Sequence, residues 1–281
     1  MDNDNDLSMS SYDIENYWST RALYSNNNLL NAVCVFRAAD IENRSIDKVQ
    51  RYVMRSALNQ IDLKGKNILE YGCGVGRWIN FFQEYGCSWN GVDISREMLT
   101  VAKNRNQNAH LKKIGGKGIP YMTKSFDLVY AVTVLHHNTY KQQETIISEM
   151  IRVLKDNGLL ILFEDIGNTF SFKMFPRSAS EWIALGEKYG LVCIWQRSLR
   201  YCILKSVVSS IKKRVNRIIR PCSIIAKPIE HNIDSKMKPF ASKLSWRGLI
   251  GYIDFFIDPY LLPLIPNKYK TTAIMVFKKK G

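Results

Sequence analysis

The amino-acid sequence predicts an α/β fold with a doubly wound, largely parallel sheet. Apolar runs typical of buried strands alternate with amphipathic helical segments, two early runs end in an acidic residue, and the first leads straight into a glycine-rich turn. A chain of 281 residues, of which 46% are hydrophobic, can bury a sizeable core. We therefore expect a sheet with right-handed crossover connections.

The first strand and its turn occupy residues 66–78, with the sequence KNILEYGCGVGRW. Glycine permits a tight turn and lets a ligand approach the backbone, and the following helix presents free N–H groups. The glycines stand at relative positions 1, 3 and 5, whereas the dinucleotide fingerprint places them at about 1, 3 and 6. Glu70 would repel a pyrophosphate but suits a cationic ligand. The turn therefore predicts a nucleoside site for another class of ligand.

The second strand ends in Asp93 and precedes a helix for which Ser95 is a suitable N-cap residue. Ligands bind at the carboxyl edge of an open parallel sheet, where a carboxylate can accept hydrogen bonds from both hydroxyls of a ribose. Asp93 therefore predicts a ribose site. A helix-capping or turn aspartate is the alternative.

The later elements continue the alternation of strand and helix. Their predicted order is a strand at 125–132 followed by the histidine pair 136–137, a helix at 142–154, a strand at 159–165, a helix at 178–189, and strands at 191–201 and 271–278. The helix at 142–154 ends before Asp156-Asn157-Gly158, a helix-terminating sequence.

Five motifs in this order resemble those of the class I S-adenosylmethionine-dependent methyltransferases. They are ILExGCGxG, GVDIS, FDLV, VLHH and EMIRVLKxxG, and together they cover roughly residues 61 to 166. The resemblance implies a Rossmann-like, seven-stranded sheet that is mostly parallel with an antiparallel last strand. It also implies S-adenosyl-L-methionine as cofactor and S-adenosyl-L-homocysteine as product. It says little about the methyl acceptor.

Carried over residue by residue, the resemblance implies a set of cofactor contacts. Glu70, Gly72, Cys73 and Gly74 would contact the methionine and ribose portions, Asp93 the ribose hydroxyls, Ile94 and Met98 the adenine, and Thr133 a further part of the cofactor. The family usually has an acid near the adenine amine after the third strand. Residues 113–117 read KIGGK here, so the amine contact stays unassigned.

The segment before the first strand, residues 1–60, is expected to form a helical lid. Residues 12–60 have helical periodicity, and the YWSTRA sequence at 17–22 resembles a stretch that folds over the cofactor in many small-molecule methyltransferases. This resemblance adds Tyr17 and Arg21 to the cofactor contacts, with Arg21 pairing with the methionine carboxylate. The alternative is a solvated arginine beside a packed aromatic pair.

Residues 61–203 form the predicted cofactor-binding core, residues 204–266 an insertion, and residues 267–281 the final strand. The last 78 residues contain sixteen Lys and Arg against four Asp and Glu, within a chain of net charge +15. Residues 205–220 predict a basic amphipathic helix, for which three roles stay open: binding an anionic membrane surface, holding a phosphorylated substrate, or packing on the core. Residues 244–266 are apolar but interrupted, so they predict an acceptor-pocket wall or ordinary packing rather than a membrane span.

The cysteine spacing and the N-terminal sequence bear on metal binding, disulfide bonds and the cellular location of the protein. The six cysteines show no paired C-x-x-C spacing, so neither a metal site nor a disulfide framework is indicated. The polar, acidic start MDNDND is unlike a signal peptide. We expect a cytoplasmic protein, with peripheral membrane association as the alternative.

Methyl transfer to a hydroxyl requires that the acceptor lose a proton, and histidine is suited to remove it near neutral pH. His136 and His137 follow the fourth strand at the ligand-binding edge. We expect one of the two to be the base and the other to be structural, with His137 preferred as the base. Glu164 and Asp165, at the end of the fifth strand, could orient the acceptor or be the base instead. A purely structural role for both histidines is also open.

The sequence thus favours methylation of a hydroxyl or amine on a small molecule, such as a secondary metabolite, a sugar or a quinone-like compound. A methyltransferase that acts on a lipid-linked substrate at a membrane is the second hypothesis. RNA methylation is the third, although no RNA-binding module is recognisable. A non-catalytic binding subunit is a further alternative, against which the intact Glu70, Gly72, Gly74 and Asp93 argue.

Overall fold

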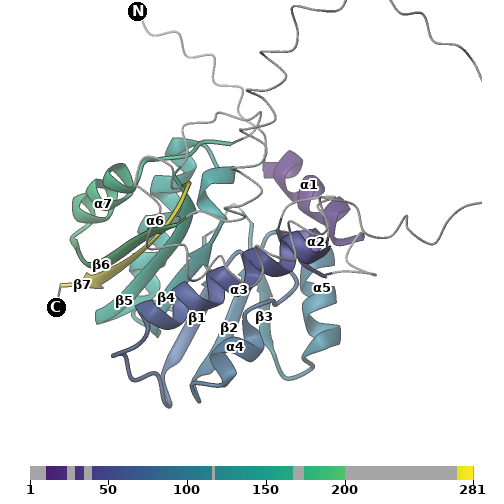
Figure 1. The fold of residues 1–281 in the computed structure, drawn as a ribbon, viewed down its shortest axis with the longest axis horizontal. Coiled ribbons are helices and arrows are strands. Elements are labelled where there is room, and N and C mark those ends of the chain that lie inside the picture. The colour runs from purple at the N-terminus through teal and green to yellow at the C-terminus, as the bar shows by residue number, and fades with distance from the viewer. Residues whose placement is uncertain are drawn as a thin grey trace, which may run out of the picture.

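The computed structural model describes residues 11–23, 29–34, 40–115, 118–166, 174–199 and 271–280. In these residues a seven-stranded sheet has the order β3-β2-β1-β4-β5-β7-β6 (Figure 1). Its strands are β1 Asn67–Tyr71, β2 Ser88–Asp93, β3 His110–Lys113, β4 Phe126–Val132, β5 Leu154–Asp165, β6 Leu191–Leu199 and β7 Thr272–Lys279. The helices are α1 Ser11–Leu23, α2 Leu29–Val33, α3 Asp40–Ala57, α4 Ile79–Gln83, α5 Arg96–Arg105, the 3₁₀ turn η2 Leu135–His137, α6 Tyr140–Val153 and α7 Ala179–Lys188.

The sheet confirms the predicted fold class. Strands β3, β2, β1, β4 and β5 pair in parallel, whereas β7 is antiparallel to both β5 and β6. The chain order reverses between β1 and β4, which are neighbours in the sheet. At such a switch point the loops leave the sheet in opposite directions and open a crevice at the carboxyl ends of the strands.

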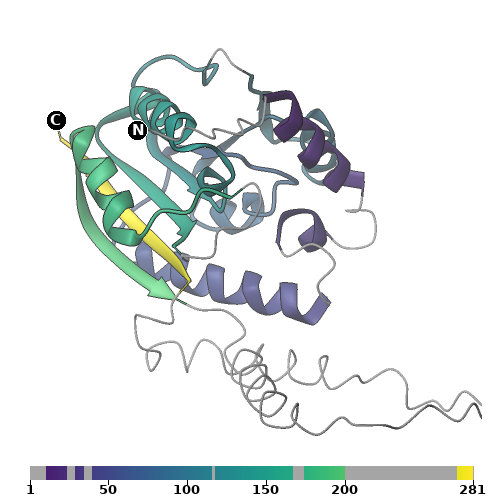
Figure 2. The same ribbon diagram turned by 90° about the horizontal axis from the view of Figure 1, so that it is seen from above.

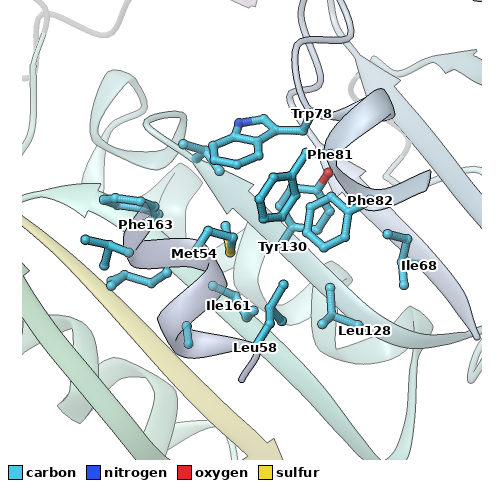
Figure 3. Packing of buried hydrophobic residues seen from close by; sticks show 14 of the residues in the cluster. Met54, Leu58, Ile68, Trp78, Phe81, Phe82, Leu128, Tyr130, Ile161 and Phe163 are labelled. Atoms are coloured by element: carbon cyan, nitrogen blue, oxygen red, sulfur yellow. The ribbon is translucent and has the colours of Figure 1, made fainter. Parts of the chain in front are cut away.

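Side chains alternate between the two faces of the strands and build two cores. Ile68 and Leu128 pack with α3 and α4, while Leu69 and Val129 pack with α6 and α7. Figure 2 shows α3 on one side of the sheet and α6 with α7 on the other. The first core is rich in large side chains, among them Met54, Leu58, Trp78, Phe81, Phe82 and Tyr130 (Figure 3).

The position of α3 divides the predicted lid segment into two parts. Val49, Val53, Met54 and Ala57 of α3 belong to the first core, so this helix covers the sheet. Helix α1 instead places Ala22 in a small separate cluster with Ala32 of α2, Val75 and Met98. Of the described helices before β1, α1 and α2 are therefore the ones that lie against the ligand-binding edge.

Side-chain caps fix the starts of the helices that follow the strands. Ser95 accepts a hydrogen bond from the N–H of Met98, as predicted for the start of α5. Helix α6 begins with a capping box between Thr139 and Gln142, two residues earlier than predicted. Strand β5 begins at Leu154 rather than at 159, because Leu154 already pairs with Phe126 before a register shift in the β4–β5 ladder.

The predicted basic insertion and its apolar part, residues 204–266, lie outside the described residues. Among the described helices, none combines the length and the apolar character that crossing a membrane requires.

Candidate functional site

A cavity of about 270 Å³ lies where β1, β2 and β4 end. Six of the predicted cofactor residues line it: Gly72, Gly74, Asp93, Ile94, Met98 and Thr133. Its other lining residues are Ile14, Trp18, Val33, Tyr71, Ile114, Gly115, Gly118, Ile119, Val132, Val134, Asn138, Gln142, Thr145, Ile146 and Glu149. The cavity is therefore bounded by the glycine loop, the ends of three strands, α1, α2 and α6.

Two glycines of the loop have conformations and surroundings that a side chain would disturb. Gly72 has φ +71°, and a Cβ there would lie 2.5 Å from a methyl carbon of Val134. Gly74 has φ +51°, and a Cβ there would lie 2.9 Å from Val33. The missing side chains keep the backbone of the loop open to the cavity. Cys73, between them, is buried and does not line the cavity.

Asp93 joins the glycine loop to the start of α5. One carboxylate oxygen accepts a hydrogen bond from the N–H of Gly74 at 2.7 Å, and the other accepts one from the N–H of Ser95 at 2.9 Å. Burial raises the pKa of Asp93 to about 6, against these backbone hydrogen bonds, which lower it. At neutral pH the group is thus an oriented carboxylate, and each oxygen retains a lone pair for a ligand hydroxyl.

Glu70 points away from the cavity, into the first core. Its carboxylate accepts a hydrogen bond from the Tyr130 hydroxyl at 2.9 Å, and that hydroxyl accepts one from the indole of Trp89 at 2.8 Å. Burial raises the pKa of Glu70 to about 8. Glu70 does not line the cavity, and its contact with the cofactor stays a prediction.

Glu164 organises the loop that follows β4. Its buried carboxylate accepts hydrogen bonds from the N–H groups of Val134 and Leu135 at 3.1 and 3.0 Å, and lies 2.7 Å from Nδ1 of His136. Burial lowers the pKa of His136, but the hydrogen bond and charge of Glu164, with the charge of Asp165, raise it above its usual value overall. His136 is thus held in a buried pair with Glu164.

His137 has the opposite electrostatic environment. Burial, together with the charges of His136 and Arg21, places its pKa well below the usual range, so its imidazole is neutral at neutral pH. Its ring packs edge-on against Trp18, with the centroids 5.1 Å apart. Asp165 has a pKa raised by burial and accepts a hydrogen bond from the Thr272 hydroxyl at 3.0 Å. His136, His137 and Asp165 do not line the cavity, and their catalytic roles stay predictions.

Helix α1 contributes Ile14 and Trp18 to the cavity, while the predicted residues Tyr17 and Arg21 do not line it. The guanidinium of Arg21 donates hydrogen bonds to the carbonyls of Asn31 and Cys34 at 3.0 and 2.8 Å, and to the Tyr17 hydroxyl at 3.2 Å. Arg21 therefore ties α1 to α2. Its pairing with the cofactor carboxylate stays a prediction.

Helix α6 provides lining residues that the sequence interpretation did not assign. Gln142, Ile146 and Glu149 line the cavity, and they recur at intervals of four and three residues on one helix face. Tyr71 is a further unassigned lining residue. The helical spacing on α6 and the position of Tyr71 beside Gly72 are the patterns that could have identified them. Within the described residues, no group of three or more His, Cys, Asp and Glu side chains is arranged to hold a metal ion.

Comparison with known proteins supports a methyltransferase domain. Residues 69–162 match the family model described as "Methyltransferase domain". The chain is 29% identical over 128 residues to the ubiquinone biosynthesis O-methyltransferase of Coxiella burnetii, covering 44% of this chain and 53% of that protein. It is 27% identical over 142 residues to the fatty-acid O-methyltransferase of Mycolicibacterium smegmatis, covering 48% and 51%. The chain spans about half the length of the curated relatives that it matches.

Solved structures share the fold at low sequence identity. The [4+2]-cyclase SpnF superposes with a TM-score of 0.60 at 13% identity, covering 97% of each chain. A putative sarcosine dimethylglycine methyltransferase from Galdieria sulphuraria superposes with a TM-score of 0.52 at 17% identity, covering 84% of this chain and 86% of that one. These likenesses show the fold. Together with the motif series, the match of residues 69–162 identifies a methyltransferase domain within this chain, similar to those of the class I S-adenosylmethionine-dependent methyltransferases.

Proposed function

We propose that this protein transfers a methyl group from S-adenosyl-L-methionine to a hydroxyl or amine of a small molecule. The main support for this proposal is the cavity at the switch point of the sheet, which Gly72, Gly74 and Asp93 line. The match of residues 69–162 to methyltransferase domains supports the same reaction class.

The residues present suit the cofactor. The Asp93 carboxylate is an acceptor for the two ribose hydroxyls, and Ile94 and Met98 offer apolar surface to a flat base. Gly72 and Gly74 line the cavity without a side chain, so their backbone is open to the methionine portion. When bound, the cofactor supplies an electrophilic methyl group on a sulfonium ion.

His137 is the best placed described residue to accept the acceptor's proton. Its lowered pKa keeps the imidazole neutral at neutral pH, as a base must be. It ends η2, which is flanked by the cavity-lining residues Val134 and Asn138, and it packs against Trp18, which also lines the cavity. His136 is less suited because its Nδ1 is paired with Glu164 and its pKa is raised.

Several of the curated relatives favour an acceptor with a reacting oxygen. The names of three of them specify O-methylation, in ubiquinone biosynthesis, on fatty acids and on malonyl-acyl-carrier protein. We therefore place an oxygen acceptor ahead of an amine.

Calorimetry with S-adenosyl-L-homocysteine tests the cofactor site. The wild-type protein is expected to bind, and Asp93→Ala to weaken binding by at least about tenfold, because a charged hydrogen-bond acceptor is lost. Asp62→Ala, at an exposed position that accepts a hydrogen bond from the N–H of Lys64, is the matched control. Equal affinity in the Asp93 variant would remove the ribose assignment.

Methyl transfer needs its own test, since a [4+2]-cyclase shares this fold. Small-molecule extracts are incubated with methyl-labelled cofactor, and the labelled product and S-adenosyl-L-homocysteine are both quantified. His137→Ala is expected to lower turnover at neutral pH by about 100-fold or more without changing cofactor affinity, whereas His110→Ala on the exposed end of β3 leaves both unchanged. Cofactor binding without methyl transfer to any extract component would contradict the proposed reaction.

A further inference from the structure

Thr133, the residue that follows β4, has a left-handed backbone conformation. Its φ is +55°, and among the described residues other than glycine only Lys124 and Asn157 also have a positive φ. Both of these are exposed and unbranched at Cβ, whereas Thr133 is β-branched, partly buried and lines the cavity. A β-branched side chain disfavours this conformation, so the surrounding contacts must hold Thr133 in it.

Two consecutive residues of β5 hold the backbone on either side of Thr133. The N–H of Thr133 donates to the carbonyl of Phe163 at 2.7 Å and continues the pairing of β4 with β5. The next two N–H groups, those of Val134 and Leu135, donate at 3.1 and 3.0 Å to one carboxylate oxygen of Glu164 instead. The chain therefore turns out of the sheet within one residue, and the left-handed conformation of Thr133 makes this change of direction.

The carboxylate of Glu164 has no capacity left for a ligand. Its other oxygen accepts a hydrogen bond from the N–H of His136 at 3.4 Å and lies 2.7 Å from Nδ1 of the same residue. The lone-pair sites of the carboxylate are thus used within the loop, and the side chain is fully buried. Any effect of Glu164 on a ligand must therefore pass through the loop.

The loop after β4 forms the part of the cavity wall that lies against the glycine turn. Thr133, Val134 and Asn138 line the cavity. Val134 lies so close to Gly72 that a Cβ on this glycine would be 2.5 Å from one of its methyl carbons. A shift of Thr133 to an ordinary backbone conformation would therefore displace Val134 from Gly72 and change the shape of the cavity.

We propose that Glu164 is a positioning residue for the cofactor: by holding Thr133 in its left-handed conformation, its carboxylate sets Val134 over Gly72 in the cavity wall. This inference rests on the proposed function. Without the carboxylate, the loop relaxes and has the binding conformation in only a fraction of the molecules. A ligand that needs this conformation then binds more weakly in proportion to that fraction.

Glu164→Gln tests the role of the carboxylate. An amide has one acceptor oxygen instead of two, and its NH2 group would face the N–H of His136. Calorimetry on the full chain with S-adenosyl-L-homocysteine is expected to show binding that is weaker by about five- to a hundredfold, because backbone strain of this kind is released. Glu144→Gln, which removes an exposed pair with Lys188 at 2.8 Å, is the matched control and should bind as the wild type does.

These affinities are measured where urea denaturation shows each variant to be folded. A purely structural role of Glu164 would lower the free energy of unfolding but leave the affinity of the folded protein unchanged. A lower affinity of the folded variant is therefore the result that distinguishes positioning from stability.

Thr133→Gly tests whether Glu164 acts through the strained backbone. Glycine adopts a positive φ freely, whereas alanine does not. In the Thr133→Gly background, Glu164→Gln should change the affinity by less than about threefold, whereas in the Thr133→Ala background it should still weaken binding by about fivefold or more. The Thr133→Ala background accounts for the side-chain contacts that are lost. Lys124→Gly, at an exposed residue with φ +57°, is the control and should leave the affinity unchanged.

The outcomes separate this inference from the proposed function. A folded Glu164→Gln variant with wild-type affinity overturns the inference and leaves the proposed cofactor intact. An equal effect of Glu164→Gln in the glycine and alanine backgrounds overturns it as well, since strain at Thr133 would not be involved. If Glu164→Gln does not fold, its combination with Thr133→Gly decides: a folded double variant with the affinity of Thr133→Gly alone supports the inference, and one that does not fold or does not bind overturns it. A wild type that does not bind S-adenosyl-L-homocysteine overturns the proposed cofactor too.

Discussion

The indole of Trp18 packs edge-on against the imidazole of His137, with ring centroids 5.1 Å apart and ring planes at 80°. Trp18 belongs to α1, before the sheet, whereas His137 ends the turn that follows β4. The guanidinium of Arg21 lies 5.0 Å from the centroid of the Trp18 ring. The pKa of His137 is lowered mainly by burial, then by the charge of His136, and then by the charge of Arg21. Helix α1 therefore contacts both the cavity and the proposed base.

Replacing Trp18 by Ala is expected to weaken S-adenosyl-L-homocysteine binding about three- to tenfold, because an aromatic contact and one wall of the cavity are lost. Trp18→Phe keeps an aromatic edge and should retain most of the affinity. Calorimetry checks both, with Tyr52→Ala, an exposed aromatic residue of α3, as control. Wild-type affinity in Trp18→Ala would show that α1 does not contribute to the site.

Replacing Gly72 by Ala tests the close packing of the glycine loop. A Cβ there would lie 2.5 and 2.7 Å from the two methyl carbons of Val134, in a residue with φ +71°. Gly65 is a matched control, because its φ is +68° and nothing lies within 4 Å of the added Cβ. We expect Gly65→Ala to lower the free energy of unfolding by about 1–2 kcal/mol and Gly72→Ala by about 2–5 kcal/mol.

Urea denaturation measures both glycine variants. Cofactor binding should weaken in Gly72→Ala, since Gly72 and Val134 both line the cavity, and should stay unchanged in Gly65→Ala. Equal destabilisation by the two substitutions would mean that the loop relaxes away from Val134 without cost.

The sequence predicted the features that local patterns determine. The strand-to-glycine turn, the acid at the end of β2 and the N-cap Ser95 each depend on residues within a few positions of one another. Because the carboxyl ends of parallel strands share one edge, the same patterns also predicted that the glycine loop and Asp93 would meet. The 2.7 Å hydrogen bond from the N–H of Gly74 to Asp93 shows how directly they do.

The remaining features depend on contacts between distant parts of the chain. Glu70 and Tyr71 face opposite sides of β1, and a single strand does not reveal which side the cavity occupies. The partner of His136, Glu164, is 28 residues away, on the neighbouring strand. Glu149 joins the site because α6 packs beside the loop after β3. Such relationships follow from the arrangement of the sheet and helices, which local periodicity does not specify.

Glu70 makes the stability of the ligand-free protein depend on pH. Burial raises its pKa from 4.5 to about 8, so between these values the unfolded chain is ionised while the folded chain keeps its proton. Stability is therefore lost as pH rises from about 4.5 to 8, by up to several kcal/mol. Glu70→Gln, which resembles the protonated acid, should match the wild type near pH 4.5 and exceed its unfolding free energy at pH 8.

Urea unfolding across this pH range measures the difference between the two proteins. Glu187→Gln, at an exposed position on α7, is the control and should show no such trend. A constant difference between wild type and Glu70→Gln at all pH values would mean that Glu70 is ionised in the folded protein throughout.

The contribution of the His136–Glu164 pair to stability should also be lost as pH rises, over a range that begins at a higher pH than that of Glu70. The folded pKa of His136 is raised above its usual 6.5, so its contribution is fully present below pH 6.5 and is lost as pH rises through the folded value. The neighbouring titratable groups are Asp165, 3.9 Å from Nε2 of His136, and His137, whose ring centroid is 4.1 Å away. Both groups are retained in Glu164→Gln. The difference in unfolding free energy between this variant and the wild type therefore reports the contribution of the Glu164 carboxylate.

We expect Glu164→Gln to lower the free energy of unfolding by about 3 kcal/mol at pH 6 and by progressively less as the pH rises to 9, because His136 loses its proton as pH rises through its raised pKa. Part of the loss persists at high pH, because an amide oxygen is a weaker acceptor for the N–H groups of Val134 and Leu135. Glu144→Gln, which removes an exposed pair with Lys188, should cost less than about 1 kcal/mol. If Glu164→Gln lost the same free energy at both pH values, His136 would be neutral in the folded protein and Glu164 would act only on the loop backbone.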